Sequence, residues 1–395
     1  MARDLRALPG RVRALLLTVL ITGITTFMLM PFLTVSLTER GFGIGPAGLC
    51  VAAILAFQQA AGPASGWLAD RYSLAPVMTV GLMLRAGALV LLAVSGSYAL
   101  LLGACVVLGM GGSMISLPIR LELIRLPEED RRQTMALRGA AVNLGALVGP
   151  GVGGVLISAS FATVCFLSAA IQIGVIVLVW CYARGTAPYG SPRPGPGPAP
   201  ARQLRGAGAA SLLVVSFAFW AAYSQINTTM PVAIVEEGLT TSALSGIFIL
   251  NAAIVLTLEY PLIRLLARKM PSTRLARWGL VLFGAAFCCL AVIPGIIGFV
   301  LFIILVSFAE IGYTSSIDDV IARSRPGGPT GAYVGLYSVA DGAGSTLGAA
   351  GGAELYSKAL DLGAVPWFWV AFAGLMGAGA VLVGRRTRSG VGKEL

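Results

Sequence analysis

The feature that most constrains this chain is a series of apolar runs, each roughly as long as the 20 residues that a helix needs to cross a lipid bilayer. They recur along nearly all of the 395 residues, and only 11% of the residues are charged, which is too few to cover the surface of a soluble protein of this size. We therefore predict an all-α membrane protein with twelve transmembrane helices. The expected helices are residues 14–37, 46–68, 75–95, 98–123, 133–156, 160–183, 208–235, 242–266, 274–293, 296–320, 331–356 and 364–384.

The net charge of +11 follows the loops and does not indicate a nucleic-acid partner. Basic side chains precede the first expected helix and follow every second one, whereas the opposite loops carry only Arg40 and Lys358. The positive-inside rule then places both termini in the cytoplasm. We expect a multi-pass protein of the cell (inner) membrane, with the lipid bilayer as its surroundings.

A stretch dense in proline and glycine, residues 184–206, interrupts the apolar pattern after the sixth run. Proline at this density cannot continue a helix and favours an extended linker. We therefore predict an N-terminal six-helix bundle at 1–183, a cytoplasmic linker at 184–207, and a C-terminal six-helix bundle with a short basic tail at 208–395.

The two halves carry matching features about 200 residues apart, which indicates a duplicated unit. The matches are Met30-Pro31 with Met230-Pro231, residues 45–48 with 242–246, and glycines 145, 149 and 153 with glycines 344, 348 and 352. Two pseudo-symmetric membrane repeats are typical of a transporter whose substrate binds between the halves.

Five residues of the fifth expected helix form the densest motif: Gly145, Gly149, Pro150, Gly153 and Gly154. Helices in lipid associate through close van der Waals contact, and glycines at every fourth position let two backbones approach. The proline bends the helix at a fixed point. The motif is either a plain packing seam or a bent surface on which the two halves rock against each other.

These residues carry a family resemblance. The motif at 145–154 matches the antiporter motif of the major facilitator superfamily, and within it the sequence resembles the twelve-helix drug:proton antiporters. Gly66, Asp70 and Arg71 match the first half of the family's loop motif, while Cys105 stands where an arginine is often found. The resemblance implies the major facilitator fold, alternating access, and a central cavity lined by helices 1, 4, 7 and 10.

Ionisable side chains inside a membrane are costly and therefore need partners. Arg138 lies seven residues before Gly145 and shares its helix face. In the family, helix 5 packs against helix 8 across the boundary between the halves, so we expect Arg138 to pair with Glu259. The pair is either a static link or a gate. Arg85, in the third run, has no predicted partner.

Two acids are candidates for proton coupling. Asp341 lies seven residues before Gly348, and the resemblance puts it near Gln58 and Gln59 of helix 2. Glu310 lies in the middle of a run that lines the cavity in the family. A carboxyl without a cation is costly to bury as an anion, which favours cycling of a proton. The alternative for each acid is a structural hydrogen bond.

Charges at the cytoplasmic end suggest a gate. Arg120 and Asp319 occupy equivalent positions in the two repeats, and the pair either closes an inner gate or consists of groups that extend into water. The loop-motif carboxylate of Asp70 is expected beside the start of helix 11 near Thr330, where exposed N–H groups favour an anion.

The expected cavity wall is polar but mostly uncharged, which suits an amphiphilic organic molecule. Its candidate residues are Thr25, Thr26, Gln58, Gln59, Trp220, Tyr223, Gln225 and Asn227.

The sequence offers no catalytic constellation. It has no histidine, and hence no Ser-His-Asp triad or His-based metal site, and it has no phosphate-binding loop. We expect no enzyme activity, no metal and no cofactor, and read the six cysteines as packing residues. Three hypotheses remain: a proton-coupled exporter of drug-like or secondary-metabolite molecules that works as a monomer, a permease for a nutrient such as a sugar or amino acid, and a non-transporting sensor or scaffold.

Overall fold

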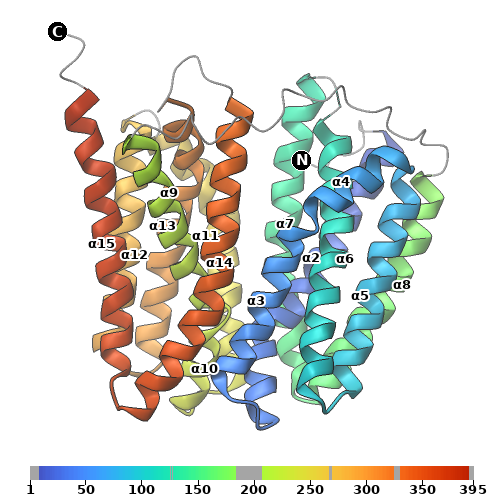
Figure 1. The fold of residues 1–395 in the computed structure, drawn as a ribbon, viewed down its shortest axis with the longest axis horizontal. Helices are drawn as coiled ribbons and strands as arrows, with labels where there is room; N and C mark the ends of the chain where they lie inside the picture. The colour runs from blue at the N-terminus through green and yellow to red at the C-terminus, as the bar shows by residue number, and fades with distance from the viewer. Residues whose placement is uncertain are drawn as a thin grey trace. The chain divides into compact units, whose positions relative to one another are not determined.

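The structure of the protein is a computed structural model that describes residues 9–124, 126, 128–183, 207–266, 269–323 and 330–390. Every regular element in these residues is a helix (Figure 1). The helices are α2 (Gly10–Glu39), α3 (Ile44–Ala60), α4 (Gly62–Arg71), α5 (Leu74–Val94), α6 (Tyr98–Ile124), α7 (Glu128–Ile157), α8 (Phe161–Ala183), α9 (Ala207–Tyr223), the 3₁₀ turn η2 (Ser224–Ile226), α10 (Thr229–Glu236), α11 (Thr241–Leu266), α12 (Ser272–Val292), α13 (Gly295–Arg323), α14 (Thr330–Asp361) and α15 (Val365–Gly390).

Each expected run coincides with one helix or with consecutive helices. Among the described residues, ten helices are long and apolar enough to cross a membrane, or eleven if α3 and α4, bent by 41°, form one span. The predicted all-α membrane class is therefore confirmed. The count of twelve and the cytoplasmic position of both termini stay predictions.

One expected run, 208–235, is interrupted by local hydrogen bonding. Ser224 Oγ donates to the Ala221 carbonyl at 2.8 Å, and Gln225 Nε2 donates to the same carbonyl at 2.8 Å. Side chains that bond their own backbone compete with the helical ladder, and a short 3₁₀ turn within a helix is a common result. The chain therefore passes from α9 through η2 into α10.

The described residues form two compact units. The N-terminal unit holds residues 9–42 and the described residues of 49–183, and the C-terminal unit holds residues 43–48 with those of 207–390. Helix α3 thus begins in the C-terminal unit, where a Cβ added to Gly48 would lie 2.1 Å from the Cβ of Ala353 on α14. Of the linker expected at 184–207, residues 184–206 lie outside the described residues, so the predicted domain boundaries stay predictions.

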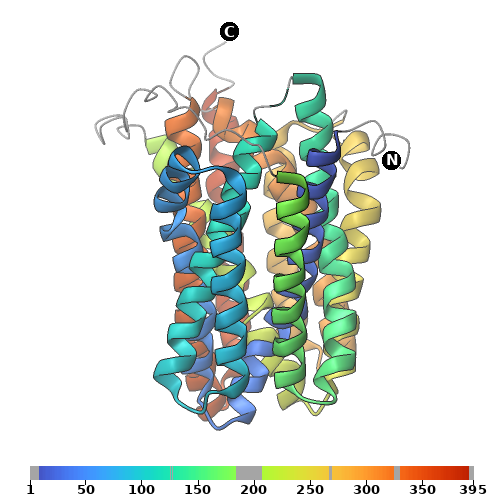
Figure 2. The same cartoon turned by 90° about the vertical axis from the view of Figure 1, so that its right-hand side faces the viewer.

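In the N-terminal unit, the glycines of α7 pack against α2 (Figures 1 and 2). A Cβ on Gly145 would lie 3.0 Å from Gly23, one on Gly149 2.8 Å from the Ile24 carbonyl, and one on Gly153 2.5 Å from the Met28 carbonyl. The glycine face of α7 is thus covered by α2 of the same unit. This corrects the expectation that the glycine face lies against the other half. Glycine spacing identifies a closely packed face, but it does not identify the neighbour.

The C-terminal unit repeats this seam between α14 and α9. A Cβ on Gly344 would lie 2.3 Å from the Phe217 carbonyl, and one on Gly348 would lie 2.5 Å from the Ala221 Cα. Gln225 lies against the third glycine of the series, Gly352. The seam glycines therefore face α9, whereas α14 contacts the start of α3 through Ala349 and Ala353.

Because both seams depend on backbone contact, adding one methyl group should disturb them. We expect Gly149→Ala to destabilise the protein by about 1–3 kcal/mol, since its Cβ would meet backbone atoms of α2. Gly139→Ala on the same helix is the control, because its Cβ would meet nothing within 4 Å. Thermal unfolding in detergent, followed by tryptophan fluorescence, measures the difference; equal unfolding temperatures for the two variants would contradict the packing described here.

Candidate functional site

The C-terminal unit encloses a carboxyl group surrounded by hydrogen-bond donors. Glu310 on α13 is partly exposed as a residue, but its Oε2 is buried and has no hydrogen-bond partner among the described residues. The hydroxyl of Tyr223 on α9 and the amide of Asn251 on α11 hydrogen-bond the same carboxyl group. Asn251 is itself held by Ser307 Oγ at 2.9 Å. Three helices therefore converge on this side chain.

This arrangement suits a carboxyl that gains and loses a proton. Within the described residues, no lysine or arginine forms an ion pair with Glu310. Tyr223 and Asn251 can donate to the ionised form, whereas a protonated carboxyl carries no net charge to desolvate. The free Oε2 leaves one position on the carboxyl for a proton or a ligand atom.

The second candidate acid, Asp341 on α14, has a partner that the sequence did not reveal. Ser216 Oγ on α9 donates to its Oδ1 at 2.6 Å, and the Tyr313 hydroxyl donates to Ser216 Oγ at 3.4 Å. The Tyr313 ring stacks on Phe219 with ring centroids 3.9 Å apart. Gln58 and Gln59 are exposed side chains of the other unit, so their expected proximity to Asp341 stays a prediction.

The N-terminal unit contains a buried cation in place of an acid. Arg85 on α5 is 8% exposed, and its Nη2 donates to Thr26 Oγ1 of α2 at 2.8 Å. The neighbouring Thr25 is 1% exposed and accepts a 2.8 Å hydrogen bond from Gln172 Nε2 of α8. Thr26 thus gives Arg85 the partner that sequence analysis could not name. The pairing joins residues far apart in the sequence, so no local signal indicates it.

The remaining cavity candidates lie at the end of α9 and in η2. Gln225 is fully buried and donates through Nε2 to the Gly348 carbonyl at 2.8 Å, which ties η2 to α14. Trp220 is half-buried and packs edge-on against Tyr223 with centroids 5.3 Å apart. Asn227 is half-buried just after η2.

Arg138 and Glu259 belong to different units, so their pairing stays a prediction. Both are half-buried, and Arg138 Nε is buried without a hydrogen-bond partner in the described residues. The structure also contains an ion pair that sequence analysis missed, between Arg11 at the start of α2 and Glu122 at the end of α6.

The gate and loop-motif candidates lie at helix ends. The Arg120 side chain is exposed, and Arg71 lies over the ring of Trp67 at 5.4 Å. The side chains of Asp70 and Asp319 lie outside the described residues, so their expected contacts stay predictions. Helix α14 begins at Thr330, as predicted.

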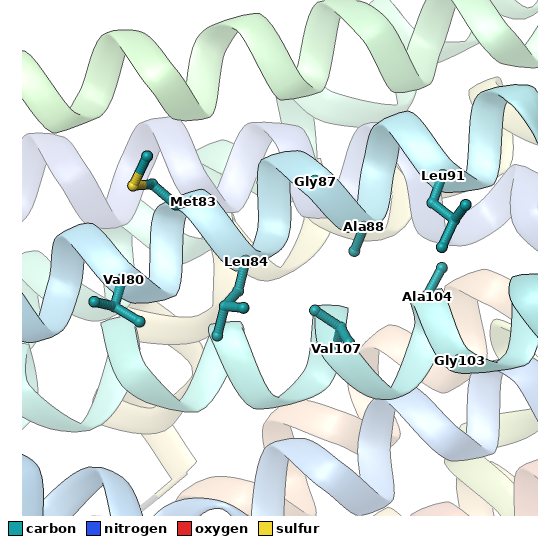
Figure 3. Close-up of a pocket in the computed structure, with 9 residues that line it drawn as sticks. All are labelled: Val80, Met83, Leu84, Gly87, Ala88, Leu91, Gly103, Ala104 and Val107. Carbon is teal, nitrogen blue, oxygen red and sulfur yellow. The ribbon is translucent and has the colours of Figure 1, made fainter.

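A groove of about 370 Å³ lies between α5 and α6 in the N-terminal unit (Figure 3). Its lining contains only apolar side chains and glycine: Val80, Met83, Leu84, Gly87, Ala88, Leu91, Gly103, Ala104 and Val107. No lining side chain can hydrogen-bond or carry a charge, so the groove has no means of orienting a polar ligand. It is therefore a poorer candidate for the substrate site than the polar clusters.

Buried ionisable groups in apolar helices and a glycine seam in each unit are together typical of a membrane transporter. A sequence profile of the Major Facilitator Superfamily matches residues 15–349, and the chain belongs to this family, as predicted. It is a multi-pass membrane protein that carries small molecules, and it is not an enzyme.

Known relatives are distant in sequence but match over most of their length. The chain is 23% identical over 355 residues to the multidrug resistance protein MdtH of Yersinia pestis (strain Pestoides F), covering 89% of this chain and 88% of that protein. The MdtH of Yersinia pseudotuberculosis serotype O:1b is equally similar.

Solved structures with the same fold include peptide transporters. One crystal structure of a POT peptide transporter matches with a TM-score of 0.81 at 15% identity, covering 96% of this chain and 95% of that one. A POT family transporter in complex with a thioalcohol-conjugated peptide matches with a TM-score of 0.81 at 11% identity, covering 98% and 99%. At such low identity, these similarities establish the fold alone.

The hydrogen bond from Ser216 to Asp341 offers a direct test of the α9–α14 cluster. We expect Ser216→Ala to lower stability by about 1–3 kcal/mol, because it removes the donor to a partly buried carboxyl group. Ser245→Ala is the matched control, since that buried hydroxyl donates only to the Thr241 carbonyl of its own helix. Thermal unfolding in detergent should separate the two variants; a loss no larger than that of the control would argue against the cluster.

Proposed function

We propose that this chain is a proton-coupled secondary transporter that exports drug-like or secondary-metabolite molecules by alternating access. It works as a monomer in the cell membrane, with both termini in the cytoplasm. The observation that carries the proposal is the Glu310 carboxyl, which has donors on two other helices, no ion-pair partner in the described residues and one unoccupied oxygen. Such a group can bind a proton from one side of the membrane and release it to the other.

Glu310 is the primary proton carrier in this proposal, and Asp341 has a supporting role. The reason is the difference in their surroundings. Ser216 occupies one oxygen of Asp341 at 2.6 Å, whereas Glu310 Oε2 has no partner in the described residues. The free oxygen of Glu310 leaves a position on the carboxyl at which a proton can bind.

The export direction and the substrate class are supported by three observations. The relatives from Yersinia carry the name multidrug resistance protein, and the glycine motif at 145–154 resembles the antiporter motif. The aromatic side chains of Trp220 and Tyr223 beside Glu310 offer a surface for an organic molecule with an apolar body.

A nutrient permease is the second candidate. The fold neighbours are peptide transporters, and the same fold serves import as well as export. The two candidates differ in the direction of proton flux. In the proposed antiporter, protons and substrate cross the membrane in opposite directions, whereas in a proton-driven nutrient permease they would cross in the same direction.

Transport in everted membrane vesicles tests the proposal. A susceptibility screen in a host that lacks its own pumps first supplies a compound to which the chain confers tolerance. Vesicles with an acidic interior should then accumulate that compound, and Glu310→Gln should reduce accumulation at least about tenfold because an amide cannot carry the proton. Glu354→Gln is the control, since Glu354 is exposed and pairs with Lys358 within its own helix.

Two results would overturn this function. One is accumulation by Glu310→Gln at the rate of the unaltered protein. The other is accumulation that is unaffected when the pH gradient is collapsed. If the chain confers no tolerance in the screen but takes up a sugar, amino acid or peptide, the nutrient permease is favoured.

A further inference from the structure

The N-terminal unit holds a buried positive charge, Arg85, that no carboxylate of the described residues neutralises. Arg85 is 8% exposed, and the ion pairs between described residues do not include it. Its Nη2 donates to Thr26 Oγ1, but its Nε is buried without a partner in the described residues. A hydroxyl oxygen can accept a hydrogen bond but cannot cancel a charge, so the guanidinium has no counter-anion among the described residues.

Glycines bring this guanidinium to its position. Where α5 crosses α6, a Cβ on Gly81 would lie 2.8 Å from the Gly111 carbonyl, so the two backbones are in contact. A Cβ on Gly111 would lie 2.8 Å from the Arg85 Cγ. The Arg85 side chain therefore packs along the α6 surface at Gly111 and Gly112, where no side chain intervenes. This packing restricts the direction in which the guanidinium points.

The space beside the guanidinium is bounded by Gly112 and Gln58. A Cβ on Gly112 would lie 3.1 Å from Arg85 Nη1 and 3.7 Å from Gln58 Oε1, so both polar groups face the place that a larger side chain would fill. Gln58 on α3 is exposed, which makes this place accessible from the α3 side.

The hydrogen-bonding direction at Thr26 fits an anion at this place. Thr26 Oγ1 donates its own hydrogen to the Thr22 carbonyl at 2.8 Å and accepts from Arg85 Nη2 at 2.8 Å. Threonine thus fixes one edge of the guanidinium, and the Nη1 edge remains directed toward Gly112 and Gln58. An arginine fork with a free edge is a good donor to a carboxylate.

We propose that Arg85, with Thr26 and Gln58, binds the anionic group of the transported molecule. The substrates are then amphiphilic organic acids or zwitterions that carry a carboxylate on an apolar body. The inference rests on the proposed function and names its substrate class. Inorganic chloride shares the chemistry of this site and is the competing occupant.

Equilibrium binding to the purified protein tests this proposal without any pH gradient. The probes are N-dansylglycine and its uncharged amide, measured by dansyl fluorescence in chloride-free detergent solution. We expect the carboxylate to bind at least about tenfold more tightly than the amide, because a charge-assisted hydrogen bond to a buried arginine is lost in the amide. Arg85→Gln should abolish this preference, and Arg85→Lys should retain part of it.

A second pair of variants keeps the charge and guards against a folding defect. Gly112→Ala places a methyl group 3.1 Å from Arg85 Nη1 and should also reduce the carboxylate preference. Gly103→Ala on the same helix should leave it unchanged, because its Cβ would meet nothing within 4 Å. Arg40→Gln is the arginine control, since that guanidinium already donates to the Leu92 carbonyl at 3.1 Å and lies over the Phe161 ring.

Each outcome decides for or against the site. Equal binding of carboxylate and amide by the unaltered protein, or an unchanged preference in both Arg85→Gln and Gly112→Ala, overturns the proposal. If added chloride competes with N-dansylglycine for binding, the proposal is supported. If chloride binds at Arg85 but the protein shows no preference for the carboxylate over the amide, the site binds the inorganic ion and the proposal is overturned. Because the binding measurement uses no pH gradient, loss of the carboxylate preference with intact proton-driven accumulation overturns this site alone, so its failure is distinguishable from failure of proton coupling.

Discussion

The architecture of both units depends on close backbone contact at glycine seams. Lipid tails are as apolar as leucine, so helices in a bilayer gain little from burying apolar side chains against one another and depend on van der Waals contact. Gly145, Gly149 and Gly153 of α7 hold α2, and Gly344 and Gly348 of α14 hold α9. These contacts fix the two helices that carry much of the polar chemistry.

The positions of the polar side chains follow from these seams. The α7 glycines contact α2 between Gly23 and Phe32, the segment that carries Thr25 and Thr26. The α14 glycines similarly contact α9 at Phe217, next to Ser216. Ser216 donates a hydrogen bond to Asp341 on α14. The two units share this design but differ in charge, because one encloses the cation Arg85 and the other encloses carboxyl groups.

Much of the fold could be predicted because it depends on local patterns. Runs of apolar residues mark the helices, the glycine spacing marks the seams, and the motif at 145–154 indicates the family. The neighbours across the seams could not be predicted. A spacing of four residues defines a helix face, but the partner of that face depends on long-range packing, and so α2 and α9 were not expected there.

The candidate sites were predicted in part for the same reason. The cost of burying a charge singled out Glu310, Asp341 and Arg85 from the sequence alone, since each stands in an apolar run. Their partners are hydroxyl and amide groups on other helices, and such groups are too common in the sequence to stand out. Thr26 was expected in a cavity wall, which stays a prediction, and its hydrogen bond from Arg85 was not expected.

The central claim is that Glu310 exchanges a proton in response to substrate, and proton release measures this most directly. A transported compound is added to purified protein in weakly buffered detergent solution near neutral pH, and a pH-indicator dye reports the protons set free. The account predicts release by the unaltered protein and none by Glu310→Gln, because the amide has no proton to give up over this pH range. Equal release by both proteins would contradict it.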